Sequence, residues 1–266
     1  MLYDFGVERD LLRRSQAAAL LSYESSSSDI SGNSTWLALA VQHARIINAH
    51  LYDHLPENGS YKRSDLKRLW WSLILRDRII ALGMRRPLQI LPSSFEVAFP
   101  EILQLQDFAD EKHSSKVYDP EIKSALCDII SSQCSLAIAL TPLIMTIYPP
   151  DQISGSSENL TSLLDRAEDA KLRLQYWRSQ HGFLFSTPQK EGHTSITLFK
   201  LLTALYYEYG PQNNSFDSMR RLIAPIRTTG LAALLCIITL PFGATRAGAF
   251  KVLQSYWMPL HLSTVS

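Results

Sequence analysis

Residues 67–90 read KRLWWSLILRDRIIALGMRRPLQI, and this stretch decides the fold class. Apolar residues recur every three or four positions in and just before it, as one face of a helix requires. They are Leu66, Leu69, Trp70, Leu73, Ile74, Ile80 and Ala81. We expect a helix over residues 65–82, ended by Gly83 because glycine commonly follows a helix C-terminus. Pro87 then prevents the helix from continuing.

Asp77 stands on this apolar stripe. An isolated buried charge is very costly, so its carboxylate must be paired or hydrogen-bonded. The candidate partners are Arg78, Arg85, Arg86 and the backbone amides around Gly83. We expect Asp77 to hold the exit of the helix in place, which is a structural role.

The rest of the chain also predicts helices. They are expected over residues 8–24, 36–51, 118–148, 159–180, 194–209 and 217–240. Ser34 or Thr35 would cap the helix over 36–51, and Pro142 would kink or split the helix over 118–148. No strand pairs or βαβ alternation appear, so the predicted fold class is all-α, in an irregular multi-helix domain.

Residues 88–120 carry prolines and acids with little periodicity, which predicts a long ordered connection. We expect residues 1–240 to form one domain and residues 241–266 to form an irregular C-terminal tail. The apolar run over 230–242 is shorter than the roughly 20 residues that a membrane-spanning helix needs. It therefore predicts a core helix and no membrane contact.

The composition and net charge of the chain limit the classes of function that it can have. The chain has 266 residues, 46% of them hydrophobic, and a formal net charge of +1. A free-standing DNA binder is normally basic over a whole face, so this balance argues against one. It leaves open a domain that works beside a separate DNA reader. Cys127, Cys134 and Cys236 form no CxxC pair, and a sparse, odd set fits a reducing, intracellular compartment.

The stretch over 67–90 resembles the fungal-specific transcription factor domain, the middle homology region of zinc-cluster regulators. That family carries a basic-Leu-Trp-Trp helix, an Asp-Arg pair and a Gly-Arg-Pro exit. The matching positions are Arg68, Leu69, Trp70, Trp71, Asp77, Arg78, Gly83, Arg86 and Pro87. The spacing departs at Met84 and Arg85, which stand before the Arg-Pro pair. The version LRDRIIALGMRRPLQI looks like the subgroup that contains cutinase transcription factors, and the resemblance covers roughly residues 12–151.

The resemblance implies an all-helical regulatory domain of a nuclear transcription regulator. Such a domain would control metabolic or secondary-metabolite genes through partner or ligand contacts. In the family, an N-terminal cluster of six cysteines binds two zinc ions and reads DNA. With 3 cysteines, this sequence lacks that cluster, so we expect no cofactor in this chain and DNA contact only through a separate domain. The implied partners are transcription-machinery or regulator proteins, and a homodimer stays open.

Catalytic and metal chemistry have little support. His50, Asp53 and His54 have a metal-like spacing, but no further ligand is evident, so we expect no metal site. The sequence has no GxSxG, HExxH or phosphate-binding glycine loop, and we expect no catalytic residue. Cys127 and Cys134 are expected to be small core residues.

Trp70 is expected in the core and Trp71 in contact with a neighbouring helix or a partner. Trp71 and Arg85 are the candidates for a ligand or partner surface. The basic residues Arg76, Arg78, Arg85 and Arg86 predict a solvated face or a salt-bridged helix end. A stand-alone small-molecule-binding helical module is the main alternative to a transcription regulator, with its pocket near the Trp70 helix and the 88–120 connection. An inactive truncated remnant and an all-α enzyme without a recognisable motif also stay open.

Overall fold

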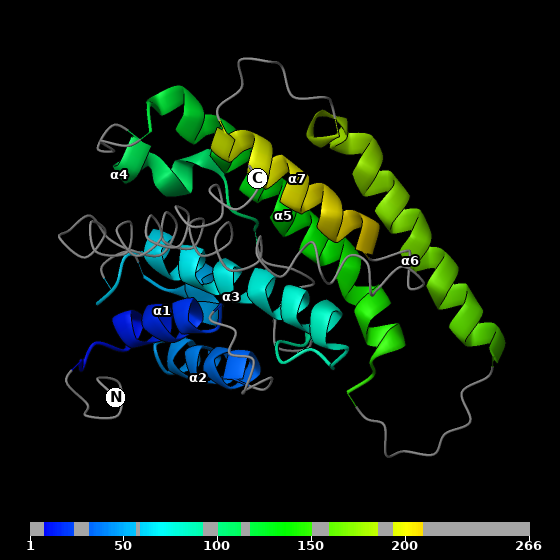
Figure 1. Ribbon diagram of the computed structural model, residues 1–266. Coiled ribbons are helices and arrows are strands. Elements are labelled where there is room, and N and C mark those ends of the chain that lie inside the picture. Colours follow the sequence, from blue (N-terminus) through cyan, green and yellow to red (C-terminus); the bar gives the residue numbers. More distant parts are fainter. Residues whose placement is uncertain are drawn as a thin grey trace, which may run out of the picture. The chain divides into compact units, whose positions relative to one another are not determined.

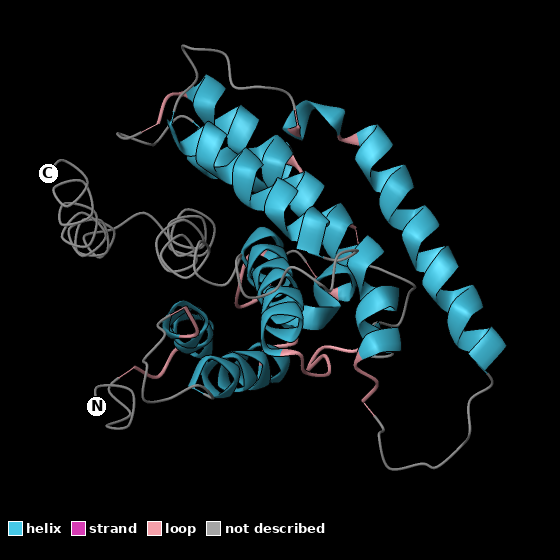
Figure 2. Ribbon diagram, turned by 45° about the vertical axis from the view of Figure 1, so that its right-hand side comes forward, coloured by secondary structure: helices cyan, strands magenta, loops and turns pink. Residues whose placement is uncertain are grey.

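The computed structural model describes residues 8–23, 32–56, 59–92, 101–112, 118–150, 160–185 and 194–209. These residues form α-helices and short 3-10 helices joined by turns, and no strand occurs among them (Figure 2). The all-α prediction is confirmed. The helix expected over 217–240, the apolar run over 230–242 and the tail over 241–266 lie outside the described residues.

The chain divides into two compact units, one of which spans residues 48–214. The other unit includes α1 (Leu11–Leu21) and α2 (Gly32–Ile46), which pack against each other. The Asp10 carboxylate caps α1 by accepting the Leu12 amide. Between the helices, the Ser15 hydroxyl donates to the Ala40 carbonyl at 2.7 Å.

The bounds predicted for the second helix are wrong at both ends. α2 begins at Gly32, so Ser34 and Thr35 lie inside its first turn. Glycine is tolerated at a helix N-terminus, where the first amides need no intrahelical partner. At the other end, Asn48 adopts a left-handed φ of 57°, and Ala49–His54 forms the separate 3-10 helix η1.

The unit over 48–214 is built around α3 (Arg63–Met84) and α5 (Pro120–Ile147). α5 packs against α3 and also against α6 (Leu160–Gln180) and α7 (Thr194–Tyr209). Figure 1 shows α6 and α7 running alongside α5. α5 is therefore the central helix that holds α3, α6 and α7 together.

The sequence of α5 fixes its start, and Pro142 does not split the helix. The Asp119 carboxylate accepts the Ile122 amide at 2.8 Å, and Pro120 occupies the first turn, where proline is tolerated. Pro142 lies inside the helix, which continues to Ile147 and is not split there. By length and composition α5 is apolar enough to cross a membrane, yet 61% of its apolar window is buried in the protein. Buried polar side chains such as Gln133 also face its neighbours, so α5 is a core helix.

The predicted connection over 88–120 is partly helical. Its described part contains η3 (Leu105–Phe108) and α4 (Ala109–Lys112). Gln104 and Asp107 form a reciprocal capping box at the start of η3. After α6, the 3-10 helix η4 (Gly182–Leu184) leads toward α7.

Candidate functional site

The helix that carries the family motif is buried on every side. Each residue of α3 from Leu66 to Leu82 is buried, and the side chains of Trp70 and Trp71 are 0% exposed. A helix enclosed in this way belongs to the core of its unit. The expectation that Trp70 lies in the core is confirmed.

Trp71 contacts the neighbouring 3-10 helix η1, which is the helix-contact alternative, and does not lie at a ligand or partner surface. Its indole N–H donates to the Glu101 carbonyl at 2.9 Å and to the Tyr52 hydroxyl at 3.2 Å. The Tyr52 hydroxyl in turn donates to the same carbonyl at 2.7 Å. A buried indole N–H needs such an acceptor, and here the acceptor comes from the connection after position 100. Trp71 thus fastens that connection to α3.

Lys67 strengthens the same attachment. Its ammonium lies 2.9 Å from the Asp107 carboxylate and 3.4 Å from the Glu101 carboxylate. The Lys67 side chain is only 4% exposed, so both partners offset its loss of hydration. Next to it in the sequence, Arg68 pairs with Asp65 and lies over the Phe108 ring, 5.7 Å from its centroid. The motif residues therefore hold residues 101–108 against the helix.

Asp77 and Arg78 organise the exit of α3. The Asp77 carboxylate accepts the amides of Gln89 and Ile90, each at 3.0 Å, and the Arg78 guanidinium at 2.9 Å. Burial raises the pKa of Asp77, while Arg78 and the two amides oppose that shift by favouring the carboxylate. Arg78 is confirmed as a partner, but the amides come from 89–90 instead of from around Gly83. The geometry matches the expected pinning of the exit by Asp77.

Arg78 also connects the exit to α5. Its Nε donates to the Thr141 hydroxyl at 3.2 Å, and its Nη1 donates to the Ile90 carbonyl at 3.0 Å. Its Nη2 is buried and has no hydrogen-bond partner among the described residues. Arg76 is buried as well, at 3% exposure. Arg78 thus confirms the alternative of a salt-bridged helix end, Arg76 does not lie on a solvated face, and Arg85 is exposed.

The helix ends two residues later than predicted. Gly83 lies inside the last turn, and Arg85 adopts the left-handed conformation, with a φ of 54°. The amides of Arg85 and Arg86 both reach the Ala81 carbonyl, so the helix closes with a left-handed C-terminal cap. Pro87 follows in an exposed position. The hydrogen bonds from the Gln89 and Ile90 amides to Asp77 fix the chain after the helix, and they outweigh the local preference for glycine at the cap.

The residues weighed as metal ligands are used in packing. Asp53 binds the Arg63 guanidinium at 2.7 Å, and the His50 ring lies 5.7 Å from the Trp70 ring. The described residues contain no group of three or more metal-ligating side chains. Cys127 and Cys134 are buried, as expected, and burial raises the pKa of the Cys134 thiol to about 12.

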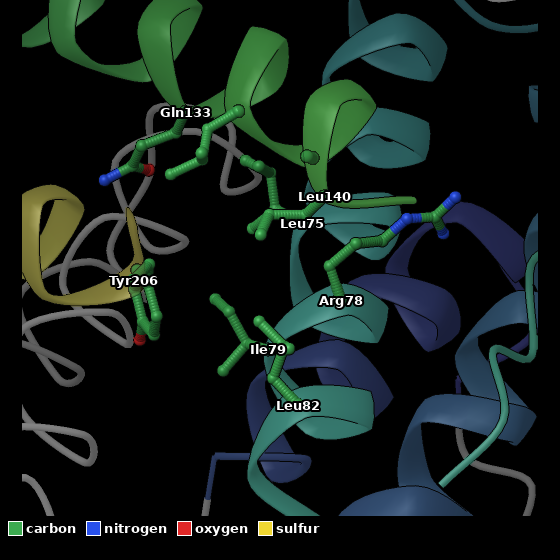
Figure 3. Close-up of a pocket in the computed structure, with 9 residues that line it drawn as sticks. Leu75, Arg78, Ile79, Leu82, Gln133, Leu140 and Tyr206 are labelled. Carbon is green, nitrogen blue, oxygen red and sulfur yellow. The ribbon is translucent and has the colours of Figure 1, made fainter. Parts of the chain in front are cut away.

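A narrow apolar cleft lies between α3, α5 and α7 (Figure 3). Its lining residues are Leu75, Arg78, Ile79, Leu82, Gln133, Leu136, Ala137, Leu140 and Tyr206. Figure 3 shows the aliphatic part of Arg78 beside the cleft and its guanidinium turned away from Gln133 and Tyr206. The cleft has room for about one water molecule, which is too little for a metabolite. Its walls are α3, which is the Trp70 helix, together with α5 and α7. A pocket beside the 88–120 connection stays a prediction.

Sequence reasoning missed a group of aromatic and basic side chains after the middle of α6. Helical periodicity places Tyr176 with the apolar residues of the core, but its side chain is 68% exposed. The run YWRSQHGFLF over residues 176–185 alternates aromatic, basic and polar residues. That alternation is a visible signal of an exposed aromatic surface, which helix periodicity alone does not reveal.

Comparison with known proteins identifies the family. Residues 1–179 match the model of the fungal specific transcription factor domain. The chain is 37% identical over 234 residues to cutinase transcription factor 1 beta of Fusarium vanettenii, covering 78% of this chain and 26% of that protein. It is 36% identical over 113 residues to a transcription factor of Fusarium pseudograminearum (strain CS3096), covering 41% and 12% of the two chains. No solved structure matches.

The chain spans about a quarter of the length of the first relative. The family match extends from the first residues through α3 and α5 to the last turn of α6, and so includes every contact described around the tryptophan pair. The family is one of transcription factor domains and not of enzymes. The chain belongs to the fungal specific transcription factor domain family.

Proposed function

We propose that this chain is a regulatory region that adjusts the transcription of metabolic genes in the nucleus through contacts with other regulator proteins. Family membership supports the role in transcription, and both relatives are named as transcription factors. The first relative is named for cutinase. Metabolic target genes, including those of secondary metabolism, are the extension that we make from it.

The burial of the motif helix supports regulation through contacts elsewhere on the domain. With Trp70, Trp71 and Asp77 enclosed, the buried part of the motif builds the scaffold and offers no face to a partner, whereas Arg85 and Pro87 beyond it are exposed. Partner contacts then fall to exposed side chains outside α3. The narrow cleft beside α3 gives no support to a metabolite-binding module.

DNA contact would come from another segment or another protein. The chain has 3 cysteines, and Cys127 and Cys134 are buried on α5, so neither is placed to hold a zinc ion in a DNA-reading cluster. The net charge of +1 also gives the chain little general attraction for a phosphate backbone. Zinc is therefore assigned only to a separate cysteine cluster.

A reporter assay in fungal cells tests the proposal. The full chain is fused to a heterologous DNA-binding module that carries its own activation segment, and reporter output is compared with that of the module alone. We expect the fusion to change output severalfold and to localise to the nucleus without an added signal. Equal output from both proteins, at equal nuclear abundance, would contradict a regulatory role.

The same assay separates a folded effect from a non-specific one. The variant Trp70→Ala removes a fully buried side chain and should cost about 3–5 kcal/mol, enough to unfold a marginal domain. The matched variant Tyr176→Ala removes an exposed aromatic side chain. We expect the first variant to lose the regulatory effect together with the fold. The second should stay folded.

A further inference from the structure

Aromatic rings and cations form a continuous cluster where α6, η4 and α7 meet. We call it the aromatic–cation cluster. Its members are Trp177, Arg178, His181, Phe183, Phe185, Lys200 and Tyr207, and the His181 ring joins Phe183 and Lys200 to the rest. All of them lie in the unit over residues 48–214, in the region that Figure 1 labels α6 and α7.

Its inner layer is a stack of rings. The Trp177 ring lies 5.5 Å from Tyr207 and 6.2 Å from Phe185, centroid to centroid. The Trp177 N–H also donates to the Ser132 carbonyl on α5 at 3.1 Å. Trp177 and Tyr207 are almost completely buried, so this layer is a fixed platform that joins three helices.

Its outer layer presents charge and apolar surface together. The Arg178 guanidinium lies 4.5 Å from the centroid of Phe185 and 5.2 Å from that of Tyr207. The Lys200 ammonium lies 5.7 Å from the centroid of Phe183, whose side chain is 44% exposed. Ring faces hold the two cations in place at the surface, which reduces the entropy lost when they bind a partner.

The two cations of the cluster stand in helices of mixed charge. Over residues 160–185 and 194–209, the basic residues Arg166, Lys171, Arg173, Arg178 and Lys200 stand against Asp165, Glu168, Asp169 and Glu208. Lys171 and Arg173 pair with acids one turn earlier in α6. Arg178 and Lys200 are therefore the two cations that the cluster itself contributes. Exposed apolar groups occur in the same stretches, at Tyr176 (68%) and Leu201 (48%).

We propose that the aromatic–cation cluster is a docking surface for an acidic segment of a partner protein that also carries aromatic or aliphatic side chains. Carboxylates of that segment would meet Arg178 and Lys200, and its apolar side chains would cover Phe183. Electrostatic complementarity of this kind speeds encounter and selects the partner, while desolvated aromatic contacts hold it. The proposal rests on the proposed function only in taking the partner to be a regulator protein.

Single-stranded nucleic acid is the competing occupant, because arginine and exposed aromatic rings also bind bases. It is disfavoured here. A nucleic-acid groove needs a track of cations along the backbone, whereas the cluster has two and the chain has a net charge of +1.

Fluorescence anisotropy with the full chain tests the proposal. The probe is a short fluorescein-labelled peptide of Asp, Glu, Phe and Leu, and the comparison peptide carries Lys at every acidic position. We expect binding of the acidic peptide only, weakening as salt rises because exposed charges are screened. The double variant Arg178→Glu/Lys200→Glu should lower affinity about tenfold or more.

Two further variants control for charge and for folding. The double variant Arg166→Glu/Lys171→Glu makes the same charge change on α6 outside the cluster, and should alter affinity by about twofold or less. Phe183→Ala keeps every charge and should still weaken binding severalfold, since an exposed ring anchors the apolar side chains of the peptide. Circular dichroism and the thermal midpoint show whether each variant folds. If Arg178→Glu/Lys200→Glu does not fold, the affinity of Phe183→Ala decides whether the cluster binds the peptide.

Several outcomes would overturn the docking surface. These are absence of binding to the acidic peptide, equal loss in the two double variants, and tighter binding of a single-stranded oligonucleotide. If the reporter effect persists while the peptide fails to bind, the docking surface is contradicted and the proposed regulatory function is not. If the peptide binds but the chain has no reporter effect, the regulatory function is contradicted and the docking surface is not.

Discussion

The guanidinium of Arg78 binds the carboxylate of its own sequence neighbour, Asp77, at 2.9 Å, and both side chains then reach backbone groups of Ile90. Asp77 accepts the Ile90 amide and Arg78 donates to the Ile90 carbonyl. Two adjacent residues thus satisfy both polar groups of one buried residue beyond the helix. This relationship makes the exit of α3 dependent on a single buried ion pair.

Asp77→Ala should lower the free energy of unfolding by about 3–5 kcal/mol, because it leaves the Arg78 charge and two amides buried without their acceptor. The measurement is urea or thermal unfolding followed by circular dichroism. Asp169→Ala, which removes an exposed ion pair with Arg173, should cost about 1 kcal/mol or less. Equal stability of Asp77→Ala and the natural sequence would remove the structural role assigned to Asp77.

Trp71→Phe should destabilise the unit by about 0.5–1.5 kcal/mol beyond the loss of ring area, because the indole donor is lost while the Glu101 carbonyl keeps the Tyr52 hydroxyl. Thermal unfolding measures the loss. Tyr176→Phe, on an exposed ring, should leave the midpoint nearly unchanged. If hydrogen exchange around residues 101–108 stays as slow in Trp71→Phe as in the natural sequence, Trp71 does not fasten that segment.

Arg85→Gly should stabilise the chain by up to about 1 kcal/mol, because a left-handed backbone costs a side-chain-bearing residue roughly that much and costs glycine little. Arg86→Gly is the matched control. Arg86 does not have a positive φ, so glycine there increases the entropy of the unfolded chain and relieves no backbone strain. The two thermal midpoints should therefore move in opposite directions, and a shared direction would contradict the assigned cap.

Stability should fall as the pH rises above about 10. Burial raises the pKa of Tyr52 above its ordinary value, so beyond that pH the unfolded state has released a proton that the folded state still holds. The folded state is then progressively disfavoured as the pH increases. Thermal midpoints measured across the alkaline range for the natural sequence and for Tyr52→Phe isolate this contribution from the other tyrosines. Parallel pH profiles would show that Tyr52 ionises as readily in the folded chain as in the unfolded one.

The helices were predictable where periodicity and caps agreed. α3 and α5 have apolar residues at helical spacing, and Asp119 and Pro120 mark the start of α5. α2 was less predictable, because its end depends on one left-handed residue, Asn48, which the surrounding apolar pattern hides. Whether a segment forms a helix depends mainly on its own sequence, whereas the residue at which the helix ends also depends on contacts with other segments.

The site was harder to predict because its contacts are long-range. Lys67 meets Asp107, and Trp71 meets Glu101, across segments that show no shared pattern in the sequence. Arg76 and Arg78 looked like surface charges because basic residues usually are, but the surrounding helices enclose both. Trp71 has no surface position for the related reason that a helix buried all round has no solvent face for its polar or amphipathic residues to occupy.

The enclosure of α3 has a consequence for genetics. Alleles that alter this helix should behave as recessive losses with low protein abundance, because misfolded chains are cleared by quality control. Alleles in the outer turns of α6 and α7 should keep normal abundance and change which proteins are co-purified. A screen that scores abundance and phenotype together would therefore sort mutations into these two groups.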